Sequence, residues 1–209
     1  MLVIPSRGRP ESLQRFFERS NVTVRGVVVL DSDDDHNYQD VDLPLNWEWL
    51  TVKPMKGFSA KANLAYKEFP DEQWYGFCGD DCVGRTEDWD LILSSFATNG
   101  YIAWGNDLLN SRCTQPFIPG SFVRELGWLC HPALKHLYVD TVWEDIAGSL
   151  SVGIYFPDII QEHFHFANGK APRDQTSRER MHEEDAETFS TINLESLVEK
   201  LRPCVSTPF

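Results

Sequence analysis

The chain has 209 residues, 42% of them hydrophobic and 12% aromatic, which is enough to build one well-buried globular domain. Its formal net charge is -13, so its surface as a whole should repel nucleic acid and anionic membranes unless the 19 basic residues gather in one place. No apolar run approaches the ~20 residues that span a bilayer, and no signal-peptide core follows Met1. The five cysteines are odd in number and lack zinc-ribbon spacing, which favours a reducing compartment. We therefore expect a cytoplasmic protein that does not act at a membrane.

Two expected strands near the start of the chain end in charged loops. An apolar strand over 2–5 leads into Ser6-Arg7-Gly8-Arg9, and a helix is expected over 11–17. Backbone N–H groups and the two arginines could grip a diphosphate there, although a surface loop with solvated arginines is the alternative. A β-branched strand over 22–30 then leads into acidic residues that could form a solvated loop or a weak calcium site. Asp31 stands out as the first residue past this strand.

The next elements culminate in a pair of adjacent acids. A third strand is expected over 47–52 and a helix over 58–67, and a buried strand then runs into Gly79-Asp80-Asp81. Two neighbouring carboxylates repel, so their pairing makes most sense if a cation such as Mg²⁺ or Mn²⁺ shares them. The alternative is a turn with an Asp ready to cap a helix. Strands that alternate with helices, with acids at strand ends, predict an α/β fold with a parallel, doubly wound sheet that suits a nucleotide.

The middle of the chain mixes helices, a strand and a long loop. We expect a helix over 86–96 with Thr86 as its N-cap, then a strand over 101–104. The segment 110–132 reads as a substrate-facing loop followed by a helix over 120–127, and its aromatic residues either stack on sugar rings or pack in the core. A further helix is expected over 140–150, with Asp140 in the N-cap position.

Paired histidines follow on the last expected strands, 152–157 and 159–166. Alternation places His163 and His165 on one side of an extended chain and their phenylalanine neighbours on the other, which suggests a metal ligand. The polar segment 167–185 has little to bury, so it is either a mobile lid or a solvated tail. An amphipathic helix over 192–201 completes the expected elements.

Taken in order, these motifs resemble those of the GT-A nucleotide-sugar glycosyltransferases, and more closely the small family-2-like enzymes of phages and bacteria. The resemblance covers roughly residues 2–166. It implies a GT-A, mostly parallel sheet with helices on both faces, with 167–209 as a lid segment and closing helix of the same domain. The residues it implies for donor binding are Pro5, Ser6, Arg7, Arg9, Asp31, Gly57, Lys61, Asn63 and Asp80.

The family's Asp-X-Asp metal motif falls on Cys78-Gly79-Asp80-Asp81, where Cys78 replaces the first acid. Asp81 is favoured as the metal ligand and Asp80 for ribose or a second metal contact, and either could be the main ligand. The resemblance also implies that His163 binds the metal. Counted back from Pro157, the catalytic base aligns with Asp140, because Glu144-Asp145 falls too late.

These parallels imply a glycosyltransferase, of hexosyltransferase type, that uses Mn²⁺ or Mg²⁺ and inverts the anomeric carbon. The donor is expected to be a nucleoside-diphosphate sugar of the UDP or GDP type. Saccharide, modified DNA base and protein acceptors all stay open. The two alternatives are a metal-dependent nucleotidyltransferase and a non-catalytic nucleotide-sugar-binding module.

Overall fold

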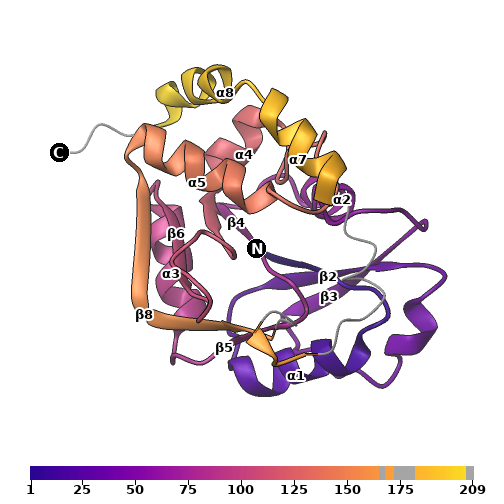
Figure 1. The fold of residues 1–209 in the computed structure, drawn as a ribbon. Coiled ribbons are helices and arrows are strands. Elements are labelled where there is room, and N and C mark those ends of the chain that lie inside the picture. Colours follow the sequence, from indigo (N-terminus) through magenta and orange to yellow (C-terminus); the bar gives the residue numbers. More distant parts are fainter. Residues whose placement is uncertain (165–167, 172–181, 206–209) are drawn as a thin grey trace.

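The computed structural model describes residues 1–164, 168–171 and 182–205 (Figure 1). The strands are β1 (Leu2–Pro5), β2 (Gly26–Asp31), β3 (Trp47–Val52), β4 (Trp74–Phe77), β5 (Cys82–Gly84), β6 (Ile102–Asn106), β7 (Phe117–Pro119) and β8 (Gly153–His163). The α-helices are α1 (Pro10–Ser20), α2 (Phe58–Glu68), α3 (Trp89–Thr98), α4 (Gly120–Leu126), α5 (Val139–Leu150), α7 (His182–Thr191) and α8 (Leu194–Leu201). Short 3₁₀ turns cover Asp35–Tyr38 and Arg202–Cys204.

The described strands form one curled sheet in the order β3-β2-β1-β4-β7-β6-β8-β5. The half built from β3, β2, β1 and β4 is parallel, as predicted, so the carboxyl ends of these strands share one edge. The other half is mixed, because β7 runs antiparallel to β4 and β6, and β5 runs antiparallel to β8. The expected α/β fold with a mostly parallel central sheet and helices on both faces is confirmed, and the antiparallel pairs lie in the half that contains β5 and β7.

Side chains that alternate along the central strands reach both faces of the sheet, and helices cover both. On β1, Leu2 and Ile4 join a core that includes Leu13 and Phe16 of α1, whereas Val3 joins the core on the opposite face. The first core also contains residues of α3, and the second is built with α2, α4, α5 and α8. Continuous apolar runs such as 2–5 are explained by this double coverage.

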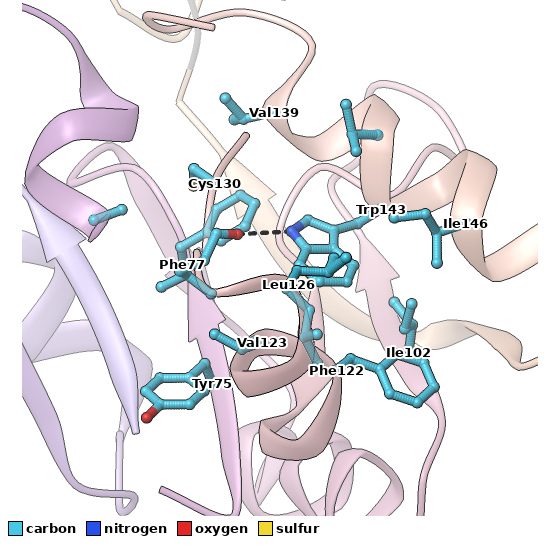
Figure 2. Close-up of a cluster of buried hydrophobic side chains, with 14 of the residues drawn as sticks. Tyr75, Phe77, Ile102, Phe122, Val123, Leu126, Cys130, Val139, Trp143 and Ile146 are labelled. Carbon is cyan, nitrogen blue, oxygen red and sulfur yellow. Dashed lines mark hydrogen bonds between the residues drawn. The ribbon is translucent and has the colours of Figure 1, made fainter. Parts of the chain in front are cut away.

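The second core is centred on Trp143 of α5, which is fully buried (Figure 2). Its indole Nε1 donates a 2.8 Å hydrogen bond to the Leu129 carbonyl, so a large apolar side chain is buried without an unpaired polar atom. Phe122 of α4 is also fully buried in this core, as is Phe117 of β7 in the other. These two aromatics of the expected substrate-facing segment pack inside the protein, which supports the packing alternative.

Two predicted helix starts were wrong. Helix α3 begins at Trp89, and the Thr86 hydroxyl instead donates to the Asp158 carbonyl on β8 at 3.0 Å. Helix α5 begins at Val139 after Tyr138, which takes a left-handed conformation with φ of 63°, so Asp140 lies in the first turn and is not the N-cap. A tertiary contact of Thr86 accompanies the later start of α3, and the left-handed backbone at Tyr138 precedes the start of α5. Local capping propensity alone did not set either boundary.

Strand β8 is one long element where two were expected (Figure 1). Its first part pairs in parallel with β6, and after an irregularity opposite Gly105 its last three residues pair with β5. Strand β8 therefore pairs first with β6 and then with β5, and its last residue, His163, is brought toward the end of β4. The register partner of Cys82 is His163 itself.

The C-terminal helices pack on the α5 side of the sheet (Figure 1). Most of the predicted lid, including 172–181, lies outside the described residues, as does His165. The last residues of that segment, 182–185, are instead the first turn of α7, and Asp185 is buried there. Among the described helices, none has the length and apolar character needed to cross a membrane.

Candidate active site at the carboxyl ends of β1, β2 and β4

The loop that follows β1 is held by polar contacts on both sides. Pro5 ends the strand and is buried beside its register partner Val29. The Ser6 hydroxyl donates to Asp80 Oδ2 at 2.6 Å and lies 2.8 Å from the Tyr38 hydroxyl, which also accepts from the Arg9 backbone N–H at 3.0 Å. Tyr38, which was not predicted as a site residue, thus fixes this loop against the first acid of the pair. Burial raises the pKa of Tyr38 to about 12, so it stays a neutral phenol.

Arg9 bridges the two adjacent acids. Its Nη1 atom lies 3.1 Å from Asp80 Oδ1 and 3.1 Å from Asp81 Oδ2, and both carboxylates are buried. Burial, and after it the charge of Asp81, raises the pKa of Asp80 to about 6, against the opposing effects of Arg9 and Ser6. Two neighbouring buried acids that share a cation are suited to bind further positive charge.

The β5–β8 ladder brings His163 to the second acid. His163 Nε2 lies 3.3 Å from Asp81 Oδ1, and the Asp81 carbonyl accepts the Phe164 backbone N–H at 2.8 Å. The guanidinium carbons of Arg15 and Arg85 lie 4.6 and 5.6 Å from the centre of the Phe164 ring. The predicted placement of His163 and Phe164 on opposite sides of the chain stays a prediction, because His165 and Phe166 lie outside the described residues.

Asp81 and His163 fit a divalent metal ion by their chemistry. A carboxylate oxygen and an imidazole nitrogen, side by side at a sheet edge, are ligands that Mn²⁺ accepts, and Mg²⁺ accepts the oxygen. The Cys82 thiol lies 3.9 Å from Asp81 Oδ1, and the ligand atoms of Asp81, Cys82 and His163 all lie within 4.8 Å of one another. Burial, followed by the charge of Asp81, raises the pKa of Cys82 well above its usual value, so without a metal this group is a thiol.

A second cluster surrounds Asp31, which has no exposed surface. Its carboxylate accepts from Lys61 Nζ at 2.7 Å, from the Met55 N–H at 3.2 Å and from Arg7, whose guanidinium also makes a two-bond contact with Asp33. These acids raise the pKa of Arg7. Three predicted residues, Arg7, Asp31 and Lys61, are thus brought together beside the group formed by Arg9 and the two adjacent acids. Arg7 and Lys61 are both cationic partners of Asp31.

Gly57 and Asn63 lie against the segment that precedes α5. Gly57 has φ of 95°, and a Cβ there would meet the Lys135 carbonyl oxygen at 2.6 Å, so only glycine fits. The Asn63 amide donates to the Cys130 carbonyl at 2.7 Å and accepts from the backbone N–H groups of Leu129 and Cys130. Both residues position the 129–135 segment in the structure, and their contact with a donor stays a prediction.

Asp140 lies in the first turn of α5, on a different element from the metal candidates Asp81 and His163. Its Oδ1 accepts the Thr141 N–H at 2.8 Å, and burial raises the pKa of its carboxyl group. Glu144, one turn later, makes an ion pair with Arg112 at 2.9 Å. A partly buried carboxyl group with a raised pKa is suited to accept a proton, whereas the paired Glu144 is less so.

Asp185 is a second residue that sequence reasoning missed. Its buried carboxylate accepts the backbone N–H groups of Lys135, His136 and Leu137 at 2.8, 2.9 and 2.8 Å. Helix α7 is thereby tied to the loop that leads into α5 and Asp140. The polar composition of 167–185 gave no sign of this contact, because the loop that Asp185 binds is about 50 residues earlier in the sequence and leaves no local pattern.

Comparison with known proteins identifies the fold. No protein-family model and no curated sequence matches the chain. Mannosyltransferase PcManGT from Pyrobaculum calidifontis, in complex with GDP-Man and Mn²⁺, superimposes with a TM-score of 0.55 at 10% identity, over 99% of this chain and 76% of that one. S. aureus TarS 1-349 in complex with UDP-GlcNAc gives 0.55 at 13% identity, over 97% and 70%. The fold is that of the GT-A glycosyltransferases.

The longer S. aureus TarS structure gives a TM-score of 0.54 at 12% identity, over 77% of this chain. The present chain spans only 35% of that protein. At identities this low the likeness establishes the GT-A fold, and the activity has to be argued from the residues at the sheet edge.

Proposed function

We propose that this chain is a metal-dependent glycosyltransferase that moves a sugar from a UDP- or GDP-type donor to an acceptor hydroxyl, with inversion. The observation that carries the proposal is the contact between Asp81 and His163, 3.3 Å apart, at the carboxyl end of β4 in a GT-A fold. Ligands of open α/β sheets bind at this edge. The neighbours' GDP-Man, Mn²⁺ and UDP-GlcNAc support the same class of ligand here.

Asp81 and His163 would hold Mn²⁺ or Mg²⁺, with Asp80 close by. When bound, such an ion neutralises charge on the donor diphosphate and so assists departure of the nucleoside diphosphate. Arg7, Arg9 and Lys61 supply further positive charge at the same edge, suited to phosphate oxygens. Their present partners are the site's own acids, so donor binding would exchange protein ion pairs for contacts with phosphate.

Asp140 would act as the general base. As the acceptor oxygen bonds to the anomeric carbon, its proton passes to Asp140, and the bond from that carbon to the diphosphate oxygen breaks with its electron pair on the diphosphate. Attack from the face opposite the leaving group inverts the anomeric carbon. The raised pKa of Asp140 increases its basicity, which favours proton transfer near neutral pH.

The product of donor turnover tests the proposal. Wild-type protein is incubated with Mn²⁺, a panel of UDP and GDP sugars and candidate saccharide acceptors. The reaction should release a nucleoside diphosphate and give a glycoside whose inverted configuration is seen by NMR. Release of pyrophosphate would identify a nucleotidyltransferase, and donor binding without turnover under any acceptor would identify a binding module. Either result contradicts the proposal. The cytoplasmic location expected from the cysteines stays a prediction.

A further inference from the structure

A cysteine, Cys82, lies beside Asp81 and His163, and its sulfur changes which metals these side chains can hold. Cys82 begins β5, and its register partner on β8 is His163, so the ladder itself sets the thiol beside the imidazole. Asp81 is the residue directly before Cys82 and completes the group, hereafter the Asp81–Cys82–His163 cluster. One nitrogen, one oxygen and one sulfur ligand therefore converge from two paired strands.

Two of the three ligand separations in the cluster are close to those around a tetrahedral ion, and the third, between Cys82 and His163, is within 4.8 Å. With zinc bonds of about 2.0–2.1 Å to nitrogen and oxygen and about 2.3 Å to sulfur, tetrahedral ligands lie roughly 3.3 Å apart for N and O and roughly 3.5 Å apart for S and O. The observed separations are 3.3 Å between His163 Nε2 and Asp81 Oδ1, and 3.9 Å between Cys82 Sγ and that same oxygen. A shift of a few tenths of an ångström in one side chain would close the sulfur distance.

The two carboxylate oxygens of Asp81 face different neighbours. Oδ2 accepts from Arg9, whereas Oδ1 faces Cys82 and His163. The side chain of His163 keeps 20% of its surface exposed and that of Asp81 11%, so an ion can reach the cluster from solvent. Three protein ligands with a remaining open position are the arrangement of many catalytic zinc sites.

We propose that the Asp81–Cys82–His163 cluster binds a thiophilic divalent cation of the Zn²⁺ or Co²⁺ class through all three side chains, without any nucleotide. Sulfur ligation favours these ions over Mn²⁺ and Mg²⁺, which prefer oxygen. On binding, the ion replaces the thiol proton of Cys82, and that proton passes to solvent. The inference deepens the proposed function, because it shares Asp81 and His163 with the proposed donor-metal site and predicts that Zn²⁺ competes with Mn²⁺ there.

The test is a Co²⁺ titration of the metal-free 209-residue chain, followed by absorption spectroscopy. The expected result is one bound ion per chain, with a near-ultraviolet thiolate-to-cobalt charge-transfer band and the intense visible bands of tetrahedral Co²⁺, both lost on addition of Zn²⁺. Cys82→Ser should abolish the charge-transfer band and weaken Co²⁺ binding at least about tenfold. Absence of the band in wild-type protein, or its persistence in Cys82→Ser, would overturn the proposal.

Cys204→Ser is the control. Cys204 is a free thiol at a half-buried position and is not a member of the cluster, so the cobalt spectrum should be retained. Loss of the band in a folded control would contradict the assignment to Cys82.

The failure of this inference can be told apart from failure of the proposed function. Both measurements use wild-type protein. A donor that binds only with Mn²⁺, together with no cobalt–thiolate band, would refute the cysteine ligand alone. A cobalt–thiolate band without nucleotide-sugar binding or turnover would support the metal site and refute the glycosyltransferase.

Discussion

Arg9 Nη1 lies 3.1 Å from Asp81 Oδ2, and this contact places a protein cation on the same carboxylate whose other oxygen faces His163. Arg9 is also 3.1 Å from Asp80. The guanidinium thereby offsets the repulsion of two adjacent buried acids in the absence of any bound ion. It follows that Arg9 should matter most for stability when metal is absent.

Replacing Arg9 with glutamine should therefore destabilise the metal-free protein. The buried acids lose their shared counter-ion, which costs about 3 kcal/mol in the free energy of unfolding. Mn²⁺ should recover more stability in Arg9→Gln than in wild-type protein. Urea unfolding with EDTA and with Mn²⁺ measures both effects. Arg7→Gln on the same loop is the control, with a smaller loss, because Asp31 keeps Lys61; equal losses would contradict this role of Arg9.

Asp80 makes stability depend on pH. Its pKa is about 6 in the folded protein and about 3.9 in an unfolded chain, so the folded state binds the proton more readily. The stabilisation from the neutral acid is present below pH ~4 and is lost as the pH rises through ~6. The free energy of unfolding of Asp80→Asn, relative to that of wild-type protein, should therefore rise by about 2–3 kcal/mol from pH 4 to pH 7 in EDTA. Urea unfolding across this range measures the gain, and a pH-independent difference would count against it.

Asp140→Asn should reduce turnover by at least ~10²-fold while donor binding is retained, because an amide cannot accept the acceptor's proton. The asparagine can still accept the Thr141 N–H, so the start of α5 should be intact. In wild-type protein, kcat/KM should fall on the acidic side with a pKa above the ordinary aspartate value, since burial raises the pKa of Asp140. Glu144→Gln, which breaks only the Arg112 ion pair, is the control. Near-normal turnover in Asp140→Asn would remove it from the role.

Asp185→Ala should loosen the loop before α5. Three backbone N–H groups lose a charged acceptor, which costs about 2–3 kcal/mol. Hydrogen exchange at residues 135–137 should accelerate, and unfolding in urea should shift to lower concentration. Glu184→Gln is the neighbouring control, because its ion pair with Lys135 is exposed and should contribute less than about 1 kcal/mol. Unchanged exchange at 135–137 in Asp185→Ala would show that α7 does not hold this loop.

Sequence reasoning succeeded where a pattern was local. Apolar runs that end in charged residues predicted β1, β2 and β4 and placed Asp31 and Asp80 at one sheet edge, as the structure has them. These features depend only on strand geometry and burial, which a single segment encodes.

The missed features depend on partners distant in the chain. β5 has three residues, too few for a periodic pattern, and it exists because Cys82 to Gly84 pair with 161–163. The thiol of Cys82 was therefore not recognised as a neighbour of His163. Tyr38 and Asp185 contact loops about 30 and 50 residues away, and no local signal marks such contacts.

The most direct test of the proposed function is a thermal-shift panel of UDP, GDP and their sugars with wild-type protein and Asp81→Asn, each in Mn²⁺, Mg²⁺ or EDTA. A nucleotide at ~100 times its dissociation constant adds about 2.7 kcal/mol, which raises Tm by roughly 5–10 °C for a domain of this size. A metal-dependent donor site predicts such a shift for one nucleoside diphosphate, in wild-type protein only and only with metal. No shift with any nucleotide, or an equal shift in EDTA and in Asp81→Asn, would contradict it.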